Sequence, residues 1–150
     1  MNVLIVYATY SGGTEQGAQI IAEVLKEKKY SVDVKRADAA SADEFKDYDL
    51  VVLGSPSWLD LDYKNGRPHQ YIIELMEKAN DIKTLGTKYA IFGMGDTNYA
   101  WFCGAVDYLQ DFVKQLGGQL ACESLRIDGF YFDEEKNREK LKKWAANLSK

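Results

Sequence analysis

The sequence predicts an α/β fold in which helices cover both faces of an open, five-stranded parallel sheet. Runs of apolar, β-branched residues alternate five times with segments whose apolar residues recur at helical spacing. Such alternation is typical of a parallel sheet, because parallel neighbours need a crossover connection that is usually a helix. The 150 residues suffice for one domain, and no repeat, low-complexity segment or linker divides them.

The elements follow one another regularly along the chain. The first strand is predicted at 3–7, a continuous apolar run of the kind that is buried on both faces. A helix then reaches Lys29, with Ile20, Ile21, Val24 and Leu25 on one face. The remaining predicted elements are strand 31–35, a polar connection 37–48 with a short helical turn, strand 50–53, helix 69–78, strand 88–93, helix 104–116, strand 119–127 and helix 133–148.

The loop after the first strand is rich in hydroxyl groups and glycine. It consists of Thr9, Tyr10, Ser11, Gly12, Gly13 and Thr14. A loop in this position aims backbone N–H groups and the positive end of a helix dipole at one point beyond the sheet. No Lys or Arg precedes Lys26, so we expect a phosphate monoester to be held here by dipoles alone. The alternative interpretation is an ordinary helix start, capped by Ser11 or Thr14, with nothing bound.

Two further loops follow strands at the same edge of the sheet, where ligands of open parallel sheets bind. The candidate residues after the third strand are Ser55, Pro56, Ser57, Trp58, Leu59 and Asp60. Those after the fourth strand are Met94, Gly95, Asp96, Tyr99, Trp101, Phe102 and Cys103. Aromatic residues beside small ones on both loops predict two walls of a slot for a flat ring. The alternative is that these aromatic side chains fold back onto the core.

The three loops together resemble those of the flavodoxin family, and the resemblance runs from Val3 to about Trp144. Thr9, Gly12 and Thr14 match the family's phosphate loop, with Ser11 in place of a threonine. The segment 54–58 resembles the second flavin loop, and 95–107 resembles the third. An uninterrupted fifth strand that ends in Leu-Arg-Ile-Asp-Gly is typical of the short-chain branch. The resemblance implies a three-layer, flavodoxin-like sandwich with strand order 2-1-3-4-5.

The resemblance also implies a function. A flavodoxin is not an enzyme but a low-potential, one-electron carrier that binds FMN non-covalently. Thr9 to Thr14 are then expected to hold the phosphate, Trp58 and Tyr99 to sandwich the ring, and backbone near Gly95 to reach its pyrimidine edge. The expected partners are an NAD(P)H- or iron-sulfur-dependent reductase and a low-potential acceptor enzyme. Both are expected to dock transiently on a monomer, steered by charge.

The sequence departs from the family at two places in the second loop. Leu59 stands where glycine is common, which predicts a less stable one-electron-reduced flavin because a β-carbon disfavours positive φ. The segment 62–69 is longer than expected and carries Lys64 and Arg67. Either it is a solvated insertion with Pro68 at the first helical position, or its charges raise the flavin potential or select a partner. His69 is expected at the start of the following helix.

Composition limits the other functions. A net charge of −4 disfavours nucleic acid as a partner, and no apolar run is long enough to span a membrane. With no signal peptide, we expect a soluble, cytoplasmic protein. Cys103 and Cys122 are expected to be free thiols, at least one of them buried. An FMN-dependent reductase or a dedicated activator of a radical enzyme remain alternatives. A phosphoacceptor receiver domain is disfavoured, since Gly54 stands where it needs an aspartate.

Overall fold

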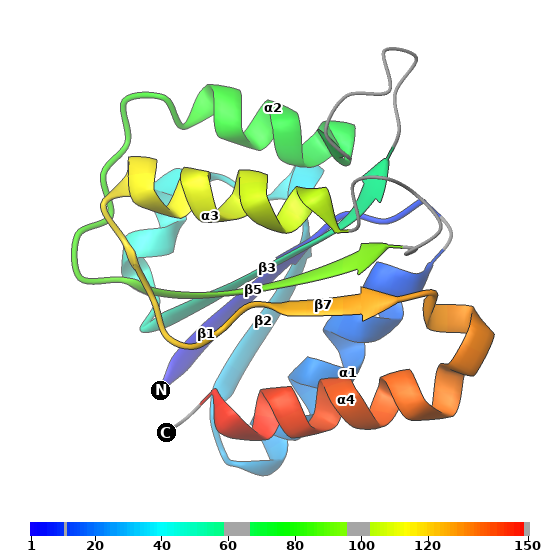
Figure 1. Cartoon of the computed structure of the whole chain (residues 1–150). Coiled ribbons are helices and arrows are strands. Elements are labelled where there is room, and N and C mark those ends of the chain that lie inside the picture. Colours follow the sequence, from blue (N-terminus) through cyan, green and yellow to red (C-terminus); the bar gives the residue numbers. More distant parts are fainter. Residues whose placement is uncertain (11, 59–66, 96–102, 149–150) are drawn as a thin grey trace.

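The computed structural model describes residues 1–10, 12–58, 67–95 and 103–148, and a twisted parallel sheet runs through its centre (Figure 1). The strands of the sheet are β1 (Asn2–Tyr7), β2 (Ser31–Arg36), β3 (Leu50–Trp58), β5 (Lys88–Gly95), β6 (Gln119–Leu120) and β7 (Leu125–Asp128). Their order is β2-β1-β3-β5, and β6 and β7 both pair with the outer edge of β5. This confirms the expected order 2-1-3-4-5, with two short strands in the fifth place.

Helices form the two outer layers. They are α1 (Gly13–Glu27), α2 (Gln70–Lys78), α3 (Gly104–Leu116) and α4 (Glu134–Asn147), with 3₁₀ turns η1 (Ala37–Ala39), η2 (Ala42–Asp47) and η3 (Phe130–Asp133). Helices α1 and α4 cover one face of the sheet, and α2 and α3 cover the other (Figure 1). In the described part of the chain, no helix combines the length and the apolar composition that a membrane crossing requires.

The sheet residues are buried on both faces, as the continuous apolar runs predict. In β1, Val3 and Ile5 pack toward α1 and α4, while Leu4 and Val6 pack toward α2 and α3. All four are fully inaccessible to solvent. The strands β1, β3 and β5 run parallel to one another. The carboxyl ends of β1, β3 and β5 therefore meet at one edge.

The prediction of one uninterrupted fifth strand at 119–127 is wrong. In the register of the sheet, Leu120 lies beside Tyr89 and Leu125 lies beside Phe92, so five steps along the edge match only three along β5. The two extra residues form a bulge within 121–124, which are not in strand conformation, and Trp144 Nε1 donates to the carbonyl of Glu123 in this segment at 2.9 Å. Bulges are common at such edges, where no further strand enforces the pairing.

The connection between β3 and α2 also differs from the prediction. Strand β3 continues through Trp58 instead of ending at residue 53, and the two-residue strand β4 (Arg67–Pro68) pairs with its end in antiparallel orientation. Pro68 thus belongs to a strand, and its expected place at the first helical position is wrong. A proline is tolerated in β4 because this strand lies at an edge, where a missing N–H breaks no ladder.

Candidate functional site

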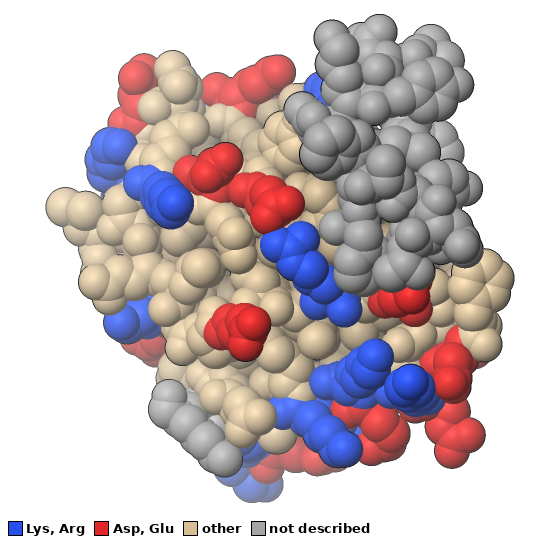
Figure 2. Space-filling model, viewed as in Figure 1, with Lys and Arg blue, Asp and Glu red and all other residues tan. Residues whose placement is uncertain are grey.

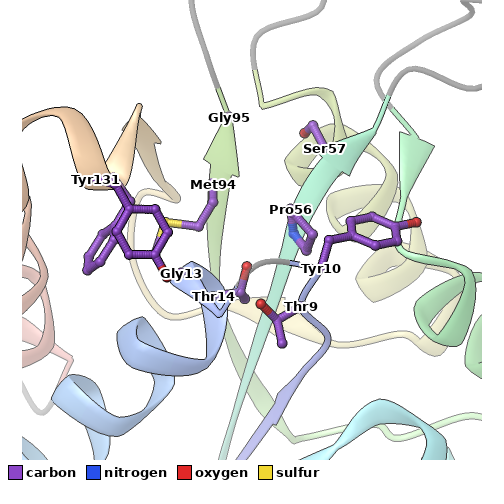
Figure 3. Close-up of a pocket in the computed structure, with 10 residues that line it drawn as sticks. Thr9, Tyr10, Gly13, Thr14, Pro56, Ser57, Met94, Gly95 and Tyr131 are labelled. Carbon is purple, nitrogen blue, oxygen red and sulfur yellow. The ribbon is translucent and has the colours of Figure 1, made fainter.

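A cavity of about 200 Å³ opens where β1, β3 and β5 end (Figure 3). Four segments far apart in the sequence line it, and their residues are Thr9, Tyr10, Gly13, Thr14, Pro56, Ser57, Met94, Gly95, Phe130 and Tyr131. The first three segments are those predicted from the sequence, and the structure brings their described residues together around one space. Every residue of this lining is uncharged, so main-chain dipoles and hydroxyl groups supply its polarity.

The hydroxyl-rich loop forms the floor of the cavity and leads directly into α1. Gly12 is the N-cap residue with φ of 91°, and its N–H donates to Thr9 Oγ1 at 2.8 Å. Glycine suits this left-handed conformation, which a β-carbon would strain. Thr14 is the second residue of α1, so the alternative in which it caps the helix is wrong. Gly13 and Thr14 thus present the first amides of α1, the positive end of its dipole, to the cavity.

Thr14 indicates what kind of ligand the cavity suits. Its side chain is 1% exposed and lines the cavity, and its Oγ1 has no hydrogen-bond partner within the described residues. A buried hydroxyl left without a partner costs roughly 1–3 kcal/mol. Figure 3 shows this hydroxyl directed into the cavity. An anion at the start of α1 would accept its hydrogen and interact with the same dipole.

The wall from β5 is shaped by a close contact beneath it. A β-carbon on Gly95 would lie only 2.8 Å from both the amide nitrogen and the Sγ of Cys103. Cys103 is fully buried, and its thiol donates weakly to the carbonyls of Gly93 and Ile127. Burial raises the pKa of this thiol to about 12. Cys103 therefore acts as a small, neutral residue that packs against Gly95, as expected of a buried thiol. It does not line the cavity.

Tyr10 points away from the centre of the cavity (Figure 3) and is about half exposed. Its ring packs on the imidazole of His69, with the ring centres 4.2 Å apart. The N–H of His69 donates to Ser55 Oγ at 2.9 Å, and Ser55 Oγ donates to the carbonyl of Pro56 at 2.8 Å. This chain of contacts ties the hydroxyl-rich loop to the wall from β3. Buried Ser55 supports the cavity without lining it.

His69 is the N-cap of α2, which confirms its expected place at the start of this helix. Its Nδ1 accepts a hydrogen bond from the N–H of Tyr71 at 3.0 Å, so the neutral imidazole is the form that caps the helix. Burial lowers the pKa of His69; the guanidinium of Arg36 lowers it too, and the carboxylates of Asp38 and Glu74 oppose these effects. Protonation of Nδ1 would remove the acceptor that Tyr71 uses.

The His69 cap predicts a specific pH dependence of stability. Because the folded protein holds His69 below its ordinary pKa of 6.5, the unfolded chain binds this proton first as the pH falls. Stability is therefore lost from about pH 6.5 downward until the folded-state pKa is reached. We expect the drop in urea-unfolding free energy from pH 7.5 to 5.5 to be smaller in His69→Asn, which keeps a capping acceptor. Equal drops in the two proteins would contradict this account.

Ser11, Leu59, Asp60, Asp96, Tyr99, Trp101 and Phe102 lie outside the described residues, and for Trp58 the structure describes only the backbone at the end of β3. The slot for a flat ring and the Lys64 insertion therefore stay predictions.

Sequence reasoning missed the fourth segment of the lining. Phe130 and Tyr131 belong to η3, the turn directly after β7. A signal was present, because Gly129 and these aromatic residues follow the fifth predicted strand at its carboxyl end. Ligands of open parallel sheets bind at such carboxyl ends, so this turn is a fourth candidate segment beside the three loops.

Comparison with known proteins adds a family assignment to this geometry. Residues 5–144 match the family model described as Flavodoxin. Over 84% of its length the chain is 40% identical to probable flavodoxin 2 of Bacillus subtilis, covering 81% of that protein. The crystal structure of oxidised flavodoxin 2 from Bacillus cereus superposes with a TM-score of 0.88 at 29% identity, covering 99% of this chain and 98% of the other.

A third comparison concerns the fold alone. The flavodoxin of Fusobacterium nucleatum, crystallised with bound flavin mononucleotide, is 18% identical and superposes with a TM-score of 0.83. The match covers 99% of this chain and 96% of the other.

Proposed function

The chain belongs to the flavodoxin family, and on this premise we propose that it is a low-potential electron carrier that binds FMN non-covalently in the cavity at the end of β1, β3 and β5. The observation that supports this most directly is Thr14 Oγ1, buried and without a partner among the described residues at the start of α1. A phosphate monoester supplies the acceptor that this hydroxyl needs. The family relatives are named as flavodoxins, which are electron carriers rather than enzymes.

The chain's residues fit such a ligand. The hydroxyl groups of Thr9 and Thr14 and the amides of Gly13 and Thr14 would hold the phosphate, with Gly12 setting the turn of the loop. The walls from β3 and β5 would flank the ring. We propose Ser11 as a further phosphate residue. For the ring we propose contacts from Pro56, Ser57, Trp58, Leu59, Asp60, Met94, Gly95, Asp96, Tyr99, Trp101 and Phe102. Ser55 and Cys103 would act indirectly, through their contacts with Pro56 and Gly95.

FMN, when bound, supplies the one-electron chemistry, and the protein supplies binding, orientation and electrostatics. The described lining offers no cation that would stabilise added negative charge. A unit positive charge at about 8 Å and an effective dielectric of 20 would contribute roughly 2 kcal/mol. The uncharged side chains of the described lining are consistent with a low reduction potential.

We further propose that the carrier acts as a cytoplasmic monomer between a reductase, dependent on NAD(P)H or iron-sulfur centres, and a low-potential acceptor enzyme. On the face in Figure 2, acidic and basic side chains are interspersed over α4, so this described surface favours neither sign of partner. We propose that a basic partner is steered by the acidic residues expected around the ring, Asp60, Asp62, Asp96 and Asp107. Of these, Asp107 pairs with Arg126 at 2.8 Å. A small interface suits the brief docking that a carrier needs.

The proposed function predicts a yellow protein. We expect the purified chain to release FMN and not FAD on denaturation, and the FMN-free form to quench the fluorescence of added FMN with one site per chain. A colourless protein that leaves micromolar FMN unquenched would reject the proposal. Steady NAD(P)H-dependent reduction of a quinone by the pure protein alone would instead favour a reductase.

A further inference from the structure

We propose that Tyr131 is a specificity-determining residue, whose ring closes the phosphate end of the cavity so that a terminal phosphate monoester fits and an extended phosphodiester does not. This inference rests on the proposed function, since it concerns the same cavity. It predicts selection of FMN over FAD, in which the phosphate continues into an adenylate. The following contacts carry the inference.

The ring of Tyr131 lies directly against the start of α1. A β-carbon on Gly12 would be 3.2 Å from the Tyr131 hydroxyl oxygen, and one on Gly13 would be 3.6 Å from its Cε2. The ring therefore occupies the space immediately outside the N-cap residue and the first residue of α1. In Figure 3 it projects from η3 on the side of the cavity opposite Thr9. A group attached beyond a phosphate at this helix start meets the ring on that side.

The phenol is held in place by a network that spans three elements. Gln16 of α1 donates through Nε2 to the Tyr131 hydroxyl oxygen at 3.2 Å. Arg138 of α4 donates to Gln16 Oε1, and its Nη2 also pairs with Glu134 Oε1 at 2.9 Å. A side chain fixed in this way resists displacement by a ligand, because moving it breaks hydrogen bonds that extend to α4.

The turn that carries Tyr131 is fixed as well. Asn137, only 3% exposed, directs its Nδ2 at the carbonyls of Asp128, Gly129 and Phe130 at 3.2–3.3 Å. Phe130 is buried and packs edge-on against the Tyr131 ring, with ring centres 5.1 Å apart. The wall therefore rests on the core, and a ligand cannot push it aside without disturbing buried contacts.

A protein can select one ligand by building a steric clash with its competitor, here a dinucleotide. A phosphate monoester ends at the amides of Gly13 and Thr14 and needs no space beyond them. A dinucleotide needs an exit for its second phosphate, and the phenol ring narrows that exit. Shortening the side chain should widen it without removing the amides or the Thr14 hydroxyl.

The test compares FMN-free wild type, Tyr131→Ala, Tyr131→Phe and Phe132→Ala in fluorescence titrations with FMN, FAD and riboflavin. We expect the ratio of FAD to FMN dissociation constants to fall about tenfold or more in Tyr131→Ala. Tyr131→Phe keeps the ring and should keep the ratio. Phe132→Ala is the matched control, because Phe132 is 83% exposed and outside the lining. Riboflavin, without a phosphate, should bind all four proteins alike.

Two results would overturn the inference: a wild-type ratio in Tyr131→Ala, or a loss of selectivity in Tyr131→Phe equal to that in Tyr131→Ala. If Tyr131→Ala does not fold, Tyr131→Ser and Tyr131→Val carry the same test, since the half-exposed ring contributes little core. Wild type that fails to bind FMN rejects the proposed function itself. Wild type that binds FMN with a ratio unchanged by truncation rejects only the role of Tyr131.

Discussion

Replacing Thr14 with Val is expected to weaken FMN binding by about ten- to a hundredfold while making the FMN-free protein more stable. The Thr14 hydroxyl is buried without a partner among the described residues, so removing it relieves the FMN-free fold of roughly 1 kcal/mol or more. In the complex the same hydroxyl would donate to a charged phosphate, and such a bond contributes about 1.5–3 kcal/mol. The two effects have opposite signs and a single cause.

Urea unfolding of the FMN-free proteins and FMN titration measure the two effects separately. Thr9→Val is the matched control, because Thr9 Oγ1 already accepts the N–H of Gly12 and its loss should destabilise the FMN-free protein by about 1 kcal/mol. Riboflavin affinity should be unchanged in Thr14→Val, since riboflavin lacks the phosphate. A Thr14→Val protein that is less stable than wild type, or that binds FMN as tightly, would refute the assignment of this hydroxyl.

The fold was largely predictable from the sequence because a strand that is buried on both faces appears as a continuous apolar run. The run from Val3 to Val6 is short, apolar at every position and rich in β-branched residues, which is typical of a strand covered on both sides. The pairing register of a strand, by contrast, is not visible in its own sequence. Whether 119–127 continues or bulges depends on how Leu125 aligns with Phe92, and that alignment is set by a neighbouring strand and by Trp144. Pro68 was misplaced for a similar reason, since β4 exists only through its pairing with β3.

The site was predictable where the ligand-binding groups lie together in one loop. Hydroxyl groups and two glycines between a strand and a helix identified the floor around Gly12 and Thr14. The position of Tyr131 after the fifth strand is visible in the sequence, but its role as a wall arises from contacts with α1 and, through Gln16, with α4, which the local sequence does not show. Arg138, near the end of the sequence, likewise acts through a contact that is distant along the chain. It donates to Gln16, which in turn donates to the Tyr131 hydroxyl beside the cavity.

Gly54→Ala is expected to destabilise the protein by about 3 kcal/mol, a large effect for one methyl group. Gly54 and Phe92 are register partners on β3 and β5, and an added β-carbon would lie 2.2 Å from the Phe92 ring. The ring is fully buried and also lies close to Gly17 and Trp144, so it has little room to move away. Urea unfolding of the FMN-free protein measures the loss. Gly13→Ala is the control, because its β-carbon would meet only ordinary contacts of 3.6 Å or more.

A double-mutant cycle identifies the cause of that loss. If the clash with the ring is responsible, Gly54→Ala should cost about 1–2 kcal/mol less in a Phe92→Leu background, where the smaller side chain leaves space. If the losses of unfolding free energy in the two single variants simply add, the cause lies in the backbone at Gly54 and not in a clash with the ring. The consequence extends to function, because Gly54 leads directly into Ser55, Pro56 and Ser57. A strand displaced by the clash moves one wall of the cavity, so FMN affinity should fall in Gly54→Ala and recover in the double variant.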